Sequence, residues 1–503
     1  MTRRSHIRPG RRITTLPTMR RLHCAAYLLV LSLIATNAAA QRLPQAPKQS
    51  PSCPDCEPRP KRFWRASAEL FVDWWIPWAV NYYIRDAEFA KVTPKSWWDN
   101  ITGDWVWDDN NFQTNQFAHP MHGNYYFNSF RSNGYNFWSS SIGAIVGSYG
   151  WECCGETHPP APNDMINTAL GGITLGEMFW RLSNLTLDNR ARGSERTWRE
   201  IGGFALSPWN GFNRLLDGRV NDVHDNPPEW RPAWAQASLD VGSRFIGSKG
   251  NSFDVLSDPL RDLAVTFRLI YGRPTLDLVG KPFSTFSLTG ELGLGTDRQK
   301  LNILSARGNL GGKVLHSGEK ALHILAARLQ YDYYFFPTAD TAFNAVVYEY
   351  GGQSFTGGIN SSFILGSGWR LLTEEYLRGV AIGAVRSDFY EISGEGRNYD
   401  FGPGLGAGLQ ATIGKPGKVL FTGAYGGTWI HTLNGTDYDH YLAQGSLDAR
   451  WYVSSRFGIG ARYDYAYRQS TPSDPAVGPV TSIKVPQARL FISTAIPRWS
   501  TID

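Results

Sequence analysis

Apolar and polar side chains alternate along much of the C-terminal half of this chain, and this pattern constrains its fold more than any other feature. A β-strand points successive side chains to opposite faces, so a period of two predicts a sheet with one apolar and one polar side. The apolar faces are rich in Tyr and Trp and the polar faces carry charges, which is typical of a membrane barrel with lipid outside. In the segment 440–453, for example, the apolar side consists of Tyr441, Ala443, Gly445, Leu447, Ala449, Trp451 and Val453.

The alternation recurs in thirteen segments, with no convincing helix between them. Single-chain bacterial barrels use even strand numbers, so we expect about 12 strands and a miscount of one. The sequence therefore predicts an antiparallel transmembrane β-barrel over residues 231–503. The thirteen segments are 234–246, 263–272, 283–296, 301–315, 321–336, 342–350, 354–366, 369–386, 402–414, 418–432, 440–453, 456–468 and 484–496.

Charged residues fall on the inward face of these predicted strands, and both signs occur. Selective pores tend to display rings of one sign. Mixed signs favour an interior crossed by ion pairs, or a plugged lumen, over a strongly ion-selective pore. The residues concerned are Arg244, Arg328, Asp332, Asp448, Arg450, Arg462 and Asp464.

The first 40 residues have the features of a secretory signal peptide. Arg20 and Arg21 precede an apolar stretch over 25–36, and the small residues at 38–40 predict the cleavage site. This segment contains seven arginines and no acid, so its positive charge exceeds the formal net charge of +6 of the whole chain. The remainder is slightly acidic, so no nucleic-acid partner is expected. Residues 41–62 are Pro-rich and predict a linker.

Residues 63–230 predict a Trp-rich helical domain. Eight tryptophans lie between positions 63 and 111, where they suit either a bilayer interface or ordinary core packing. Asn163 follows a Pro-rich turn and is expected to be a helix N-cap. Residues 205–230 carry turn formers and predict a link to the barrel. Helices are expected over 112–135, 137–152, 163–187 and 193–204.

The helical domain also contains the densest group of polar residues that could carry chemistry. Three interpretations compete: a divalent metal site, metal-free acid–base catalysis on a lipid or envelope polymer, and a structural role at helix ends. The catalytic candidates are His119, Glu152, Glu156, Asp164 and Asn167, with Glu152 or Asp164 as the base and His119 as the proton shuttle. The metal candidates are His119, His122, Glu152 and Glu156, with His158 as a further one.

Four cysteines follow the leader, and their spacing predicts no cofactor. Cys53 and Cys56 favour a disulfide in an oxidising compartment, while a redox or haem motif lacks its expected context. The adjacent Cys153 and Cys154 lack zinc-ligand spacing. The glycine-rich stretch 402–408 lies in a predicted strand rather than before a helix, so a phosphate-binding loop is not expected.

Several spaced motifs resemble an uncharacterised bacterial domain-of-unknown-function family of the 3943 type. They are 114–123 (TNQFAHPMHG), 126–134 (YFNSFRSNG), Trp151-Glu152 with Glu156, 162–167 (PNDMIN) with Gly171-Gly172 and Gly176-Glu177, 192–196 (RGSER) and 211–214 (GFNR). The resemblance covers roughly residues 70–220. It implies an exported Gram-negative envelope protein and supplies no activity.

These observations predict an α+β chain, with an N-terminal helical periplasmic domain and a C-terminal outer-membrane β-barrel. The expected partners are outer-membrane lipid and the barrel-assembly machinery. We expect the helical domain to plug or dock on the periplasmic mouth of the barrel, in transport or envelope maintenance. The alternative is a membrane-associated enzyme that acts on lipid or cell-wall material through the His/Glu/Asp cluster.

Overall fold

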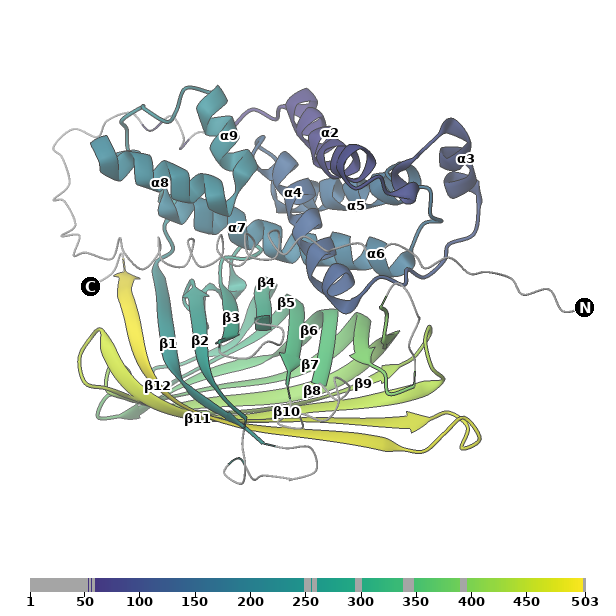
Figure 1. The fold of residues 1–503 in the computed structure, drawn as a ribbon. Helices are drawn as coiled ribbons and strands as arrows, with labels where there is room; N and C mark the ends of the chain where they lie inside the picture. The colour runs from purple at the N-terminus through teal and green to yellow at the C-terminus, as the bar shows by residue number, and fades with distance from the viewer. Residues whose placement is uncertain are drawn as a thin grey trace, which may run out of the picture. The chain divides into compact units, whose positions relative to one another are not determined.

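A computed structural model describes residues 53, 56, 59–247, 255, 260–294, 301–337, 348–389 and 396–500, with side chains up to residue 495. The predicted signal peptide and most of the predicted linker lie outside these residues. A helical region over residues 63–216 precedes a closed barrel of 12 antiparallel strands (Figure 1). The predicted fold class is confirmed, and so is the expected strand number.

The barrel closes by pairing its first strand with its last, where Phe245 pairs with Ala488 and Val241 with Ile492. Residues 348–350 of the predicted segment 342–350 and all of the predicted segment 354–366 belong to one strand that continues through Gly351 and Gly352, and residues 342–347 lie outside the described residues. The strands are β1 (Trp234–Ile246), β2 (Leu260–Tyr271), β3 (Phe286–Leu294), β4 (Leu301–Ser317), β5 (Ala321–Phe336), β6 (Tyr348–Gly366), β7 (Trp369–Arg386), β8 (Tyr399–Lys415), β9 (Val419–His431), β10 (Tyr438–Tyr452), β11 (Phe457–Pro472) and β12 (Thr481–Ser500).

The two faces of the barrel wall differ as the alternation predicts. On β10, Leu447 is 67% exposed and Trp451 61% exposed, whereas Asp448 and Arg450 between them are buried. The charged face is the inner one, because its side chains bond across the barrel to strands that are not neighbours. All seven charged residues predicted to point inward form ion pairs: Arg244, Arg328, Asp332, Asp448, Arg450, Arg462 and Asp464.

The interior of the barrel also contains apolar side chains. One cluster lies among the strand ends that the longer connections join, and it includes Tyr348, Val385, Ile430, Leu442 and Val485. Near the opposite ends, the 3₁₀ turn η7 (Leu276–Val279) places Leu278 against Ile324 and Ala326 of β5. Both groups pack on the inner face, so the described part of the lumen is occupied at two levels.

The helical region contains α2 (Phe63–Ala79), α3 (Pro94–Thr102), α4 (His119–Arg131), α5 (Phe137–Cys154), α6 (Pro162–Ile166), α7 (Gly172–Thr186), α8 (Gly193–Leu206) and α9 (Pro208–Leu216). Short π-helical turns, η4 (Thr114–Ala118) and η5 (Asn167–Gly171), interrupt what we expected to be two continuous helices. Helix α9 lies where only turns were expected. No helix in the described part of the chain is long and apolar enough to span a membrane.

The helical region packs against the outer wall of β5, β6 and β8, whereas we expected it at the mouth of the barrel. Along the outer face of β5, Leu325 is 46% exposed but Tyr331 and Tyr333 are fully buried. The Tyr331 hydroxyl donates a hydrogen bond to the Gln116 carbonyl (2.6 Å), and Phe112 packs on Tyr333. Helices therefore cover part of the face that lipid was expected to cover.

A buried acid–histidine cluster as the candidate functional site

Close helix packing brings the predicted site residues together. A Cβ atom at Gly123 of α4 would lie 1.8 Å from the Thr168 carbonyl oxygen in η5, and one at Gly171 would lie 2.6 Å from Pro120. Only glycine permits backbones to approach this closely. The first turn of α4 therefore lies directly against η5 and the end of α6.

His119 in that first turn contacts two residues of the α6–η5 segment. Its Nε2 atom lies 3.5 Å from Oδ1 of Asp164, and its Nδ1 atom lies 3.1 Å from the Thr168 hydroxyl. The Asn163 side-chain amide donates a hydrogen bond to the same Asp164 oxygen (2.8 Å). Asn163 is thus part of the cluster and not the helix N-cap that we expected; Ala161 occupies the N-cap position, with Pro162 in the first turn.

Glu152 and Glu156 reach the cluster from the end of α5 and the loop after it. Helix α5 ends at Cys154, so Glu156 lies beyond it. Glu152 is 1% exposed, and its Oε2 atom accepts a hydrogen bond from the Ala161 amide (2.9 Å). The Glu156 carbonyl accepts a hydrogen bond from the Asn100 side chain (3.0 Å).

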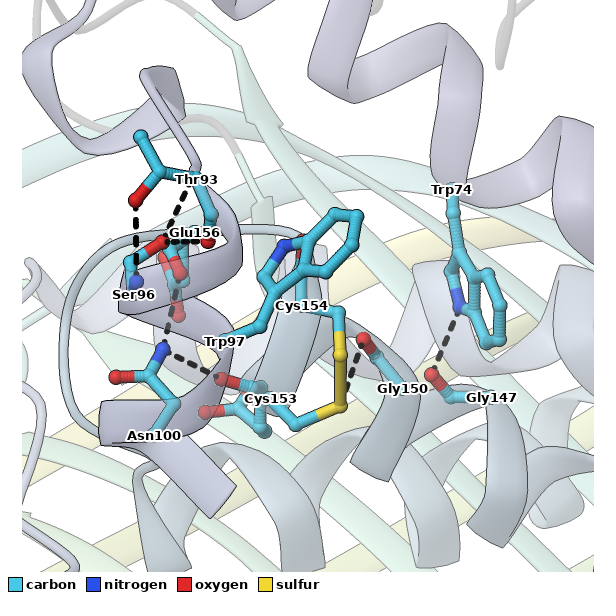
Figure 2. Close-up of a disulfide and its surroundings, with 11 residues drawn as sticks. Trp74, Thr93, Ser96, Trp97, Asn100, Gly147, Gly150, Cys153, Cys154 and Glu156 are labelled. Atoms are coloured by element: carbon cyan, nitrogen blue, oxygen red, sulfur yellow. Dashed lines mark hydrogen bonds between the residues drawn. A yellow bond between two sulfur atoms is a disulfide. The ribbon is translucent and has the colours of Figure 1, made fainter. Parts of the chain in front are cut away.

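A vicinal disulfide follows Glu152 directly in the sequence (Figure 2). Cys153 and Cys154 are bonded at the end of α5, and the Trp97 indole N–H donates to the Cys154 carbonyl (3.0 Å). Asn100 and Trp97 both come from α3, so this short helix is bonded to the end of α5 through side chains. The expected disulfide between Cys53 and Cys56 is also present.

Burial and mutual repulsion set the protonation of the cluster. Burial raises the pKa of Glu152 to about 8, and the nearby Asp108 carboxylate adds to the effect. Burial, followed by the neighbouring carboxylates, raises the pKa of Glu156 and of Asp164 well above their ordinary values. Burial lowers the pKa of His119 to about 4, although Asp108 opposes this shift. At neutral pH the cluster therefore holds protonated carboxyls beside a neutral imidazole.

Asp108 was not predicted, and it connects the cluster to the barrel. Its backbone amide donates to Asn163 (3.0 Å), and its Oδ2 atom accepts from the Asn115 side chain (3.0 Å). The same Asn115 amide donates to the hydroxyl of Tyr399 on β8 (2.7 Å). Asp108 lies in a loop that contains several acids and amides. Sequence spacing does not show which of these residues would join the cluster.

Two further candidates lie apart from the cluster. His122 is turned toward α2, where its Nε2 atom lies 3.0 Å from the Asp73 carbonyl oxygen. Asn167 is fully buried in η5, and neither polar atom of its side chain has a hydrogen-bond partner among the described residues. Within the described ranges, no group of three or more His, Cys, Asp or Glu side chains is arranged to hold a metal ion.

The arrangement is suited to moving protons. A neutral imidazole accepts a proton, and carboxyls with raised pKa values donate one near neutral pH. Perturbed groups of this kind occur at functional sites, although structural networks also produce them. Asp108 and Glu156 are half-buried, so the cluster reaches the surface on their side.

Residues 104–209 match the family described as a domain of unknown function (DUF3943), which confirms the resemblance over that part of the chain. The acid–histidine cluster lies within the matched residues. No curated protein matches the sequence.

Among solved structures, the barrel is similar to three outer-membrane proteins. The NanC porin is 8% identical over 51% of this chain and 98% of its own, with a TM-score of 0.28. The outer membrane channel DcaP of Acinetobacter baumannii is 8% identical over 52% and 96%, with a TM-score of 0.25. An outer membrane channel from Pseudomonas putida F1 is 12% identical over 52% and 96%, with a TM-score of 0.28.

Proposed function

We propose that this protein is an outer-membrane β-barrel that anchors its helical region at the membrane for envelope maintenance, and that the barrel is a closed anchor and not an open diffusion pore. The observation that carries this proposal is the set of ion pairs across the lumen. Arg268 of β2 donates to Asp448 of β10 (3.2 Å), and Arg450 of β10 pairs with Asp240 of β1 (2.8 Å).

Other interior contacts support a closed barrel. The Gln444 side chain of β10 donates to the Tyr348 hydroxyl of β6 (3.1 Å), which joins opposite walls. A cavity bounded by Asp240, Arg268, Arg462 and Arg489 has a volume of only about 10 Å³. That is close to the space of a single water molecule. The paired side chains therefore leave little free space between these strands.

The exposed surface supports a location in lipid. Apolar residues such as Leu405, Leu447 and Leu490 are each more than 60% exposed on the outer wall. On α5, the exposed face carries Trp138 and Ile142 and no charged residue. Large contiguous apolar surfaces of this kind are rare on soluble monomers. We infer that both the barrel and this helix face contact lipid.

A permeability assay tests the proposed function in cells. If the protein maintains the envelope, deletion of its gene increases uptake of a hydrophobic dye, and the full-length protein restores the barrier. If the protein is an open channel, deletion instead reduces uptake of small polar solutes. That second result would overturn the proposal.

A second candidate function is enzymatic, and the acid–histidine cluster favours it. In this alternative, we propose that His119, Glu152 and Asp164 act on a lipid or cell-wall substrate. The substrate would enter beside Asp108 and Glu156. The convergence of His119 and Asp164 supports it (3.5 Å). The test is to express the conservative variants His119→Gln, Glu152→Gln and Asp164→Asn in the deletion strain and to measure whether each one restores the barrier to the dye. Normal folding with loss of the barrier supports catalysis, whereas full restoration by all three variants excludes it.

A further inference from the structure

The outer wall of the barrel contains a hollow of about 650 Å³ that the proposed anchoring function does not use. Its volume falls within the range of about 300–1,000 Å³ that is usual for ligand sites. The hollow spans β9 to β12 and reaches β1. The outer-face residues around it are almost all apolar, and they include Val419, Phe421, Ala449, Ala461 and Leu490.

Side-chain size along one row of the sheet produces the hollow. Ala449 of β10 pairs with Ala461 of β11, and these two small residues form the floor. Phe421 pairs with Ala449 from one side, and Leu490 pairs with Ala461 from the other. Phe421 is 48% exposed and Leu490 is 62% exposed, so both stand above the floor as walls. The result is an apolar groove that is open on the outer side.

Two exposed cations lie at the end of this groove where short turns join the strands. Lys418 directly precedes Val419, and its carbonyl accepts a hydrogen bond from the Tyr452 amide (2.8 Å). Arg456 lies in the next turn, and its carbonyl accepts from the Ala495 amide (2.7 Å). Both side chains are exposed. The two turns, 415–418 and 453–456, contain no acid.

We propose that this groove binds one anionic phospholipid, with an acyl chain along the floor of Ala449 and Ala461 and the phosphate at Lys418 and Arg456. Lys and Arg form strong charge-assisted hydrogen bonds with phosphate. Short turns of membrane barrels face the periplasm, so the basic end of the groove meets the phospholipid leaflet. This inference rests on the proposed location of the barrel in the outer membrane.

Native mass spectrometry of the full-length protein in mild detergent tests the inference, with phosphatidylglycerol and phosphatidylcholine as probes. The expected result is one retained phosphatidylglycerol and little phosphatidylcholine. Reversing the two charges in K418E/R456E should reduce phosphatidylglycerol affinity at least about tenfold, because each cation contributes to the attraction of the anionic headgroup. Filling the floor in A449F/A461F should reduce the affinity for both lipids.

Matched controls separate the groove from general effects. Ala411→Phe adds one phenyl ring to the outer face of β8, and Lys320→Glu reverses a cation in the turn between β4 and β5; both should retain the lipid. Equal affinity for phosphatidylglycerol in the wild type and K418E/R456E overturns the inference, and so does equal retention of phosphatidylcholine by the wild type. The exposed charge variant decides the result if A449F/A461F fails to fold. Absence of the wild type from the outer-membrane fraction would instead overturn the proposed function.

Discussion

Arg450 of β10 bonds to Asp240 of β1 inside the barrel, with 2.8 Å between Nη2 and Oδ2. Strands β11 and β12 separate the two residues in the sheet, so the pair bridges the curvature of the wall. Arg450 also pairs with Asp448 (2.7 Å), which in turn accepts from Arg268 (3.2 Å). A chain of alternating charges thus links β1 and β2 to β10 across the interior of the barrel.

Arg450→Leu should destabilise the barrel strongly, because it leaves two buried carboxylates without this cation. Loss of one partner of a buried pair costs about 3–5 kcal/mol. The temperature at which the compact band converts to the unfolded band on gels should fall. Asp439→Asn is the control, because its pair with His431 is exposed and worth less than about 1 kcal/mol. Equal shifts in the two variants would contradict a structural role for the interior network.

Arg397→Ala should loosen the helical region from the barrel. The Arg397 side chain is fully buried, donates to Asp109 (2.8 Å) and also donates to the Tyr399 carbonyl (3.1 Å). Limited proteolysis should cleave the helical region of this variant faster and leave the barrel intact. Lys95→Ala removes an exposed pair within α3 and should not change the cleavage rate. Unchanged cleavage in Arg397→Ala would show that this contact does not hold the two parts together.

Loss of the proton of Glu152 should make the helical region less stable as pH rises. Its pKa is raised to about 8 in the folded protein, from the usual 4.5. Between these values the folded state holds a proton that the unfolded state has released, so the free energy of unfolding falls with increasing pH. The lowered pKa of His119, about 4, acts in the opposite direction below pH 6.5.

Glu152→Gln removes this titration and keeps an oxygen to accept the hydrogen bond from the Ala161 amide. The decline in stability between pH 6.5 and 8 should therefore be smaller in the variant. Urea unfolding followed by tryptophan fluorescence at the two pH values measures it. Glu195→Gln, at an exposed position of α8, should leave the decline unchanged. An unchanged decline in Glu152→Gln would show that Glu152 is already ionised at pH 6.5.

The four cysteines after the leader should be oxidised in the exported protein. Thiol alkylation of the unreduced protein should label none of Cys53, Cys56, Cys153 and Cys154, since both pairs are bonded. Mass spectrometry after reduction should then find four labels. Labelling of Cys153 or Cys154 without reduction would contradict the vicinal disulfide beside Glu152.

The sequence predicts the barrel wall well because its two faces differ chemically. The alternation of Arg328, Gln330 and Asp332 with Leu329 and Tyr331 assigns every one of these residues to the correct face of β5. It cannot predict what covers the outer face, because Leu325 under solvent or lipid and Tyr331 under a helix are both apolar. The predicted position of the helical region, at the mouth of the barrel, was therefore wrong. The sequence predicts two segments where the structure has the single strand β6, because Gly351 and Gly352 are typical turn residues.

The site was predictable only in part. His119, Glu152, Glu156 and Asp164 are unusual residues in an otherwise apolar or amide-rich segment, and the structure places them together. Thr168 is an ordinary residue type at a helix start, so its bond to His119 depends on the close contact of α4 with η5. The bond from Asn163 to Asp164 is local to α6, and nothing in the sequence marks it. The π-helical turn η5, which forms one side of this contact, leaves no recognisable periodicity in the sequence.

Conductance of the refolded full-length protein in a planar bilayer tests the central claim most directly, after gel migration has shown a compact, heat-modifiable barrel. The account predicts compact migration and no open-channel current, because paired charges and apolar side chains fill the lumen. Stable single-channel steps would contradict the closed barrel and make transport the primary function. Migration that heating does not change would contradict the membrane barrel itself.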